Sequence, residues 1–207
     1  VFLLWLGWFG FNGGSVLSAD PGAVSYVFVT TTLAAAAGIF GAMITSWNVQ
    51  HKPDLSMVLN GCLAGLVGIT AGADCVSVVS AVIIGAIAGA VVVLVSIGID
   101  RFLRLDDPVG ALSVHLICGI WGTLAVGIFG SFAWEDGKMV PASYSLWTQL
   151  LGVIVVGVFC LLAAAAIFAT IKAVMGIRVH ADEELVGLDI SEHGMEAYGG
   201  FQIFSNE

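Results

Sequence analysis

Charged residues are scarce in this sequence. Only 10% of the 207 residues are Asp, Glu, Lys or Arg, whereas about 25% is usual for a soluble domain. Six Lys and Arg residues are too few for a protein that binds nucleic acid. The four cysteines show no close pairing that would indicate a disulfide framework or a zinc site. These shortages exclude a soluble globular domain, a disordered chain and a nucleic-acid-binding protein.

Long apolar stretches are present instead. A membrane-spanning helix needs about 20 mostly apolar residues. Six stretches without Asp, Glu, Lys or Arg fit that length, namely 1–19, 23–47, 55–73, 76–99, 109–133 and 144–171. The sequence therefore predicts an all-α membrane protein, with six transmembrane helices in a bundle over residues 1–175. Residues 176–207 hold seven of the 15 acidic residues and form a predicted acidic tail.

The two ends of the chain are predicted to lie on the same side of the membrane, since the number of spans is even. Five of the six basic residues fall on that side: Lys52, Arg101, Arg104, Lys172 and Arg178. Basic residues in short loops favour the cytoplasm. We therefore expect a multi-pass protein of the cell membrane with a cytoplasmic tail. Because Val1 enters an apolar stretch with no basic region before it, we expect that a natural N-terminal portion is missing.

Glycines at helical spacing predict close helix contacts. Gly61 and Gly65 are four residues apart, as are Gly85 and Gly89, and small residues at this spacing let helix backbones approach in lipid. A bundle with so many small residues can be tightly packed or can surround a narrow lumen. Composition does not decide between these two.

His115 is the most informative single residue. It follows the last charge, Asp107, by eight residues, which is roughly 12 Å along a helix. An ionisable side chain at that depth is costly and is a candidate for function. A neutral imidazole has one donor and one acceptor, so it can pass a small polar molecule along a pore. The alternative is a structural hydrogen bond to a neighbouring helix.

A second candidate site lies in the segment 7–15, GWFGFNGGS. Trp8, Phe11 and Ser15 fall on one helical face. Aromatic faces attract small cations, and a hydroxyl can accept a hydrogen bond. An aromatic belt at the membrane interface is the equally weighted alternative.

Other patterns favour structure over chemistry. Asp106, Asp107 and Pro108 precede the helix of His115 and suit helix capping. The spans contain no Ser-His-Asp set, no HExxH motif and no phosphate-binding loop. We therefore expect no enzyme, no metal and no cofactor.

Taken together, four segments resemble the ammonium transporter (Amt/Mep/Rh) family, in its Amt branch. They are GWFGFNGGS at 7–15, NGCLAGLVGITAG at 60–72, DDPVGALSVHLICGIWG at 106–122 and GLDISEHGMEAY at 187–198. The resemblance implies an eleven-helix fold built from two inverted five-helix repeats and a last helix. This chain then corresponds to the second half of that fold: the second repeat, the last helix and the cytoplasmic tail.

The resemblance also implies roles for individual residues. His115 is the second of two paired pore histidines, Leu63 and Trp8 line the pore, Phe11 is one of two stacked phenylalanines at the outer gate, and Ser15 helps to recruit ammonium. Gly110 stands where many relatives have an acid, so no role of that acid transfers to it.

The resemblance implies transport of ammonium, or of its analogue methylammonium, with deprotonation at the outer mouth and conduction of NH3 past the histidines. It further implies a homotrimer in the lipid bilayer and a PII-type signalling protein bound on the cytoplasmic face. Gly187, Asp189, His193 and Tyr198 form the regulatory tail in this interpretation. An ammonium sensor that signals through its tail is the alternative, and an intramembrane enzyme that uses His115 is a second one.

Overall fold

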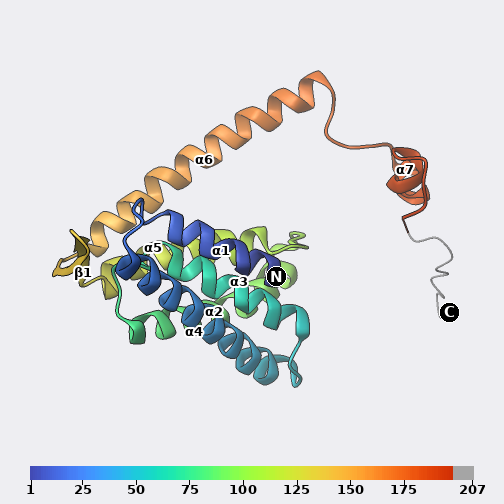
Figure 1. The fold of residues 1–207 in the computed structure, drawn as a ribbon. Helices are drawn as coiled ribbons and strands as arrows, with labels where there is room; N and C mark the ends of the chain where they lie inside the picture. The colour runs from blue at the N-terminus through green and yellow to red at the C-terminus, as the bar shows by residue number, and fades with distance from the viewer. Residues whose placement is uncertain (198–207) are drawn as a thin grey trace. The chain divides into compact units, whose positions relative to one another are not determined.

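The computed structural model describes residues 1–197 and divides into two compact units, Val1–Val156 and Gly157–Glu207. The first unit contains the helices α1 (Phe2–Gly14), α2 (Pro21–Gln50), α3 (Leu55–Thr70), α4 (Val78–Gly98) and α5 (Cys118–Phe129) (Figure 1). Two π-helical segments flank the loop before α5, η1 (Ile99–Leu103) and η2 (Ala111–Ile117). Helix α6 (Leu146–Val174) begins in the first unit and ends in the second.

Side chains at the helix starts explain where several helices begin. Asp20 accepts a hydrogen bond from the Ala23 amide at 2.8 Å, and Asp54 accepts one from the Met57 amide at 2.9 Å. These caps satisfy amide groups that have no partner within the helix. At the other end of α2, His51 takes a left-handed conformation with φ of 60°, which ends the helix.

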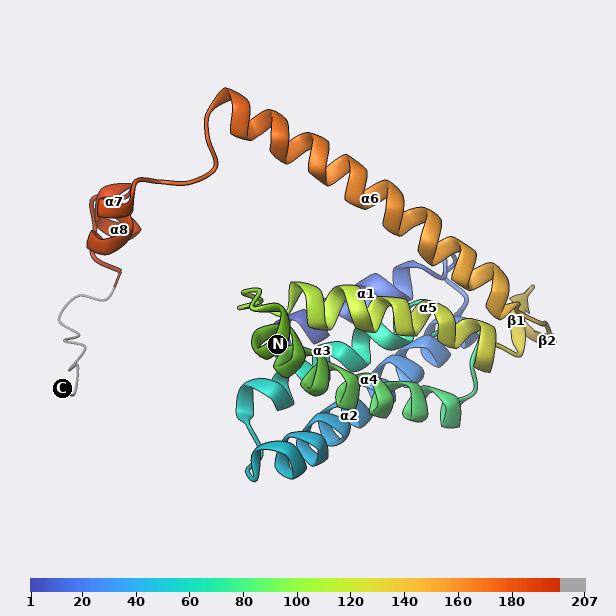
Figure 2. The same cartoon turned by 180° about the vertical axis from the view of Figure 1, so that it is seen from behind.

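Helices α2, α3 and α4 lie side by side and form the centre of the first unit (Figures 1 and 2). The two predicted glycine seams both pack on α2. A Cβ atom at Gly65 or at Gly85 would clash with the backbone oxygen of Ala34, and one at Gly89 would clash with the oxygen of Gly38. The absence of side chains at these positions therefore allows three backbones to meet.

Two buried clusters fill the unit. The larger contains Leu66, Val92, Val93 and Cys118, and Trp8 and Trp121 pack against it. The other surrounds Val27, Ile69, Val76 and Ile84 near the opposite end of the same helices. Because lipid tails are as apolar as these side chains, the clusters stabilise the bundle through close packing and dispersion contacts.

The fold is mostly helical, as the sequence predicted, with one short sheet that was not predicted. Between the fifth and sixth predicted spans, β1 (Phe132–Glu135) and β2 (Lys138–Pro141) form an antiparallel hairpin. Asp136 and Gly137 join the strands, with φ of 48° and 73°. Two left-handed residues in a two-residue loop suit the twist of a hairpin, and Asp-Gly is a favoured pair there.

Each predicted span contains a helix, but the helices differ in length. Within the described residues 1–197, four helical segments are long and apolar enough to cross a membrane: Pro21–Gln50, Val78–Leu103, Ala111–Phe129 and Leu146–Val174. Helix α1 has 13 residues and α3 has 16, fewer than the roughly 20 that a span requires. The count of six spans therefore stays a prediction.

The described part of the second unit, residues 157–197, contains the end of α6 and two short helices, α7 (Ala181–Val186) and α8 (Leu188–Ser191). Acidic residues Asp182, Glu183 and Glu184 occupy the first turn of α7, where the helix dipole favours negative charge. The predicted boundary between bundle and tail at residue 176 stays a prediction.

Candidate functional site

His115 lies in an open groove of about 310 Å³ within the first unit. We call it the His115 groove and define it by its lining residues, which are Trp8, Phe11, Val67, Thr70, Ala71, His115, Gly119 and Thr123. They come from α1, from α3 and the residue after it, and from η2 and α5. Apart from His115, the lining carries no ionisable side chain. The groove thus combines an imidazole with an apolar and aromatic wall.

The imidazole projects from a π-helical turn. The Gly110 oxygen accepts hydrogen bonds from the amides of Val114, at 2.9 Å, and of His115, at 3.3 Å. A π-helical turn inserts one residue per turn relative to an α-helix, which changes the direction of the side chains that follow, and such turns are frequent at functional sites.

Asp107 fixes the start of this π-helix, as the sequence predicted. Its carboxylate accepts hydrogen bonds from the amides of Leu112, at 3.0 Å, and Ser113, at 2.9 Å, and from the Ser113 hydroxyl at 2.9 Å. Burial alone would raise the pKa of Asp107, but these hydrogen bonds outweigh it and lower the pKa below its usual value. Asp106 is exposed.

Gly110 is required by the same turn. Its φ is +72°, and a Cβ atom there would lie 2.7 Å from Cγ2 of Val114. A side chain at residue 110 would therefore be strained both by the backbone conformation and by contact.

The far end of the π-helix is tied to a neighbouring helix. Sγ of Cys118 lies 3.4 Å from the Ser113 oxygen and 3.6 Å from the Ala88 oxygen of α4. The π-helix that carries His115 is thus held at its start by a carboxylate and at its end by a buried thiol.

Trp8 and Phe11 form the aromatic wall of the groove. Their ring centroids are 5.7 Å apart with an interplanar angle of 71°, an edge-to-face arrangement that aromatic pairs favour. Nε1 of Trp8 donates a hydrogen bond to Oγ1 of Thr70 at 2.8 Å. This bond fixes the indole ring against α3, so that its face is held beside the groove.

Ser15 lies beyond the end of α1, and its hydroxyl donates to the Phe11 oxygen at 2.7 Å. It lines a second, smaller cavity rather than the His115 groove. Thr70 and Ala71 line both spaces, so the two adjoin along the end of α3. Trp8, Phe11 and Ser15, which were predicted to share one helical face, therefore line two neighbouring cavities.

Leu63 lies in the buried core, with 7% of its surface exposed, and Val67, one turn further along α3, lines the groove. A pore-lining role for Leu63 stays a prediction. The sequence interpretation missed Val67, Thr70, Gly119 and Thr123. Gly119 and Thr123 follow His115 at intervals of four residues, so helical spacing from the histidine would have identified them.

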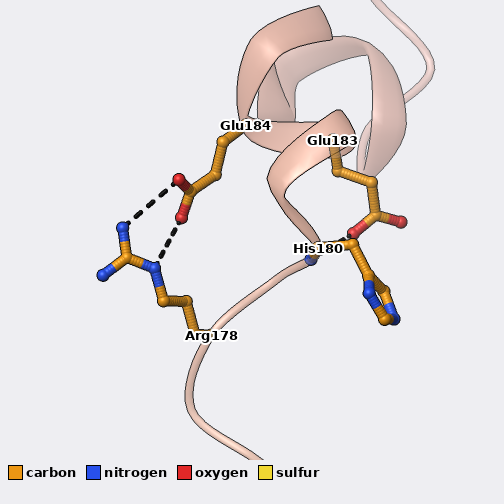
Figure 3. Close-up of polar contacts among 4 residues, drawn as sticks. All are labelled: Arg178, His180, Glu183 and Glu184. Atoms are coloured by element: carbon orange, nitrogen blue, oxygen red, sulfur yellow. Dashed lines mark hydrogen bonds and ion pairs between the residues drawn. The ribbon is translucent and has the colours of Figure 1, made fainter.

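The tail residues predicted for regulation lie in the second unit. Arg178 forms an ion pair with Glu184, with Nε and Oε1 2.9 Å apart, and Glu183 accepts a hydrogen bond from the His180 amide at 3.1 Å (Figure 3). The ion pair raises the pKa of Arg178. These contacts order the start of α7.

The predicted tail motif begins at a left-handed turn. Gly187 has φ of +107°, and the Asp189 carboxylate accepts a hydrogen bond from the Ala197 amide at 2.9 Å. That bond lowers the pKa of Asp189. His193 is exposed, and Tyr198 lies outside the described residues.

A family model described as the Ammonium Transporter Family matches residues 1–198. Among curated relatives, Ammonium transporter Amt2 of Archaeoglobus fulgidus is 43% identical over 100% of this chain and 46% of its own length. The ammonium transporter of Bacillus subtilis is 36% identical over 95% of this chain and 49% of its own length. The chain spans about half the length of these relatives.

Solved structures have the same fold over nearly all of the chain. A protein named Sensor Amt Protein matches with a TM-score of 0.81 and 36% identity, over 92% of this chain and 47% of that one. Mep2 of Candida albicans matches with a TM-score of 0.77 and 29% identity, over 92% of this chain and 44% of that one.

Proposed function

This chain belongs to the ammonium transporter family, and we propose that it forms part of a membrane protein that moves ammonium across the cell membrane as NH3. The observation that carries the proposal is the His115 groove, where one imidazole faces an apolar and aromatic lining. The relatives are named ammonium transporters, and four helical segments in the described part of the chain have the length and composition of membrane spans.

The lining of the groove suits a neutral cargo better than a charged one. Stripping water from a cation costs several kcal/mol or more when the surroundings are apolar. The aromatic faces of Trp8 and Phe11 attract a cation at the mouth, and Ser15 lies in the adjoining cavity. In the proposed mechanism NH4+ gives one proton to water at this end, the paired histidines relay that proton separately, and NH3 continues past His115.

His115 serves this mechanism as a neutral hydrogen-bonding group. One ring nitrogen donates and the other accepts, so the ring can pair with NH3 or with a transferred proton. The family resemblance implies a second histidine that pairs with His115 in the pore. A requirement for a removable proton also separates ammonium from potassium, an ion of about the same size that has no proton to lose.

The experiment is saturable uptake of methylammonium into liposomes that contain the protein at its full natural length. We expect His115→Ala to abolish selective uptake because the groove loses its only ionisable group. His51→Asn is the matched control, since His51 is exposed and its left-handed conformation tolerates asparagine. Full, selective uptake by His115→Ala would contradict the role assigned to this residue.

We further propose that the tail faces the cytoplasm, that the protein is a homotrimer, and that a PII-type signalling protein binds its cytoplasmic side. The basic residues of the loops and the GLDISEHGMEAY segment support this assignment. Deletion of residues 176–207 is expected to weaken co-purification of PII or to change the regulation of uptake. Unchanged behaviour in both assays would contradict the proposal, and native mass spectrometry tests the trimer.

An ammonium sensor is the second candidate, because a structural neighbour with 36% identity is named Sensor Amt Protein. A sensor binds ammonium without appreciable flux and passes the signal through its tail. Measured uptake in liposomes separates the two functions: saturable flux supports a transporter, whereas binding without flux supports a sensor.

A further inference from the structure

A glycine, Gly119, lies in the wall of the His115 groove. It follows His115 by four residues and precedes Thr123 by four, and all three residues line the groove. Residues at this spacing share one face of a helix. Because Gly119 has no side chain, the wall leaves extra space between the imidazole and the Thr123 side chain.

A glycine inside a helix needs a physical reason, since glycine destabilises a helix interior more than any residue except proline. The other two glycines of α5 have such a reason. A Cβ atom at Gly122 would clash with the backbone oxygen of Gly68 in α3. One at Gly127 would clash with the backbone of Leu146 at the start of α6. Close packing therefore requires glycine at both positions.

Packing gives no such reason at Gly119. The backbone there is helical, and the nearest atom that a Cβ would meet is Cγ1 of Val67 at 3.9 Å, an ordinary van der Waals contact. Alanine would therefore fit at residue 119 without a clash and would favour the helix. Because Val67 also lines the groove, the added methyl group would narrow the space between α3 and α5.

The neighbouring side chains are held by hydrogen bonds, so they cannot readily move aside for a larger cargo. The Thr123 hydroxyl donates to the Gly119 oxygen at 3.0 Å. On the side of α1 and α3, Nε1 of Trp8 donates to Oγ1 of Thr70, and the Thr70 hydroxyl donates to the Leu66 oxygen at 2.7 Å. Walls fixed in this way discriminate between cargoes by size.

From these observations we propose that Gly119 determines how large an amine can pass His115, which makes it a specificity-determining residue of the groove. The missing methyl group at residue 119 leaves room for an alkyl group on the nitrogen of the cargo, as in methylammonium and its unprotonated form. NH3 has no alkyl group and does not need this room. The inference rests on the proposed function, since it requires that an amine moves along the groove.

The test compares uptake of isotope-labelled ammonium and methylammonium into liposomes that contain the protein at its full natural length. We expect Gly119→Ala to lower kcat/KM for methylammonium about tenfold relative to kcat/KM for ammonium, because one extra carbon in a closely fitting apolar site costs at least about this factor. The ratio is the decisive readout, since a variant that is only less well folded loses uptake of both amines in equal proportion.

Val67→Ala gives a second readout that a purely structural role of Gly119 would not change. Cγ1 of Val67 is the nearest atom to a methyl group added at residue 119, so its removal should restore the space. We expect the double variant Gly119→Ala/Val67→Ala to bring the ratio of methylammonium to ammonium uptake back toward that of the unaltered protein. A ratio that stays at the value of Gly119→Ala would contradict the assigned role of groove width.

Gly98→Ala is the matched control, because it makes the same substitution at a glycine of α4 that meets nothing within 4 Å and is not part of the groove lining. It should keep the ratio of the unaltered protein. Melting temperatures in lipid nanodiscs test the packing argument separately. We expect Gly119→Ala to melt at the same temperature as the unaltered protein or at a higher one. A clear fall would show that packing requires this glycine and would overturn the inference.

The outcomes separate this inference from the proposed function. If the unaltered protein takes up both amines and Gly119→Ala lowers both equally or neither, only the inference about Gly119 fails. If the unaltered protein takes up neither amine, the transport proposal fails. The amine concentration that gives half of the rise in melting temperature then tests residue 119, because a binding groove of fixed width also distinguishes the two cations by size. An unchanged ratio of these concentrations in Gly119→Ala would overturn the inference.

Discussion

A histidine within an apolar helix needs a hydrogen-bond partner or an open space beside it, and His115 borders such a space. Its position depends on residues that do not touch the groove. Asp107 caps the π-helix, Gly110 supplies the left-handed residue before it, and Cys118 ties its end to α4. The direction of one ring therefore depends on a carboxylate eight residues earlier in the chain.

The hydrogen bonds of the Asp107 carboxylate predict that its contribution to stability depends on pH. Because its pKa is lowered in the folded protein, its stabilising contribution is present above the unfolded pKa of about 3.9 and is lost as the pH falls through the lower folded value. We expect Asp107→Asn to lower the free energy of unfolding by about 1 kcal/mol near neutral pH, as loss of a helix cap does. At acid pH, where the carboxyl group is protonated in the unaltered protein as well, the substitution should have little effect.

Melting temperatures from pH 7 down to pH 3, measured in detergent, check this prediction. Asp106→Asn is the control, because Asp106 is exposed. The prediction would be contradicted if the difference in melting temperature between Asp107→Asn and the unaltered protein stayed constant over the whole pH range. In that case the charge of the carboxylate would not contribute to stability.

At the scale of elements, the contact of α2 with α3 and α4 depends on glycines. Both seams were identified from spacing alone, but the sequence could not show that they meet the same part of α2. Gly65 and Gly85 approach Ala34 from two different helices. Small residues at 34–38, the segment AAAAG, complete this meeting point.

The seam gives a prediction with an internal control. Gly85→Ala places a methyl group against the Ala34 backbone, and overpacking of this kind costs about 1–3 kcal/mol. Gly98→Ala, near the end of the same helix, meets nothing within 4 Å and gains about 1 kcal/mol of helix propensity. We expect the apparent melting temperature to fall in Gly85→Ala and to stay the same or rise in Gly98→Ala. Equal changes in both variants would show that the contact between Gly85 and the Ala34 backbone is not tightly packed.

At the scale of the whole molecule, the groove is open. His115 is exposed and Phe11 is 59% exposed, so residues 1–197, which the structure describes, do not by themselves enclose a passage. The chain also spans about half the length of its relatives. An open groove cannot keep potassium or protons from passing beside the cargo.

We therefore expect that the 207-residue chain, reconstituted by itself in liposomes, gives no saturable, selective methylammonium uptake, whereas the protein at full natural length does. The control is circular dichroism of the reconstituted chain, which should show that the helices are formed. Selective uptake by the helical chain alone would contradict this expectation and would place a complete pore within these residues.

The sequence by itself determined which segments are helical, and it indicated one candidate site. Runs of apolar residues cannot satisfy their backbone groups in lipid except as helices, and a single histidine within such a run marks a candidate site. The sequence also contained Asp136-Gly137, a turn signal that would have predicted the hairpin had it been weighed against the helical context.

Only the tertiary structure decided which residues share a space. It placed Val67 rather than Leu63 at the groove and separated Ser15 from Trp8 and Phe11. These outcomes depend on helix rotation and on a π-helical turn, which shift a side chain by a fraction of a helical turn. Local sequence preferences do not resolve such shifts, because packing against distant helices sets them.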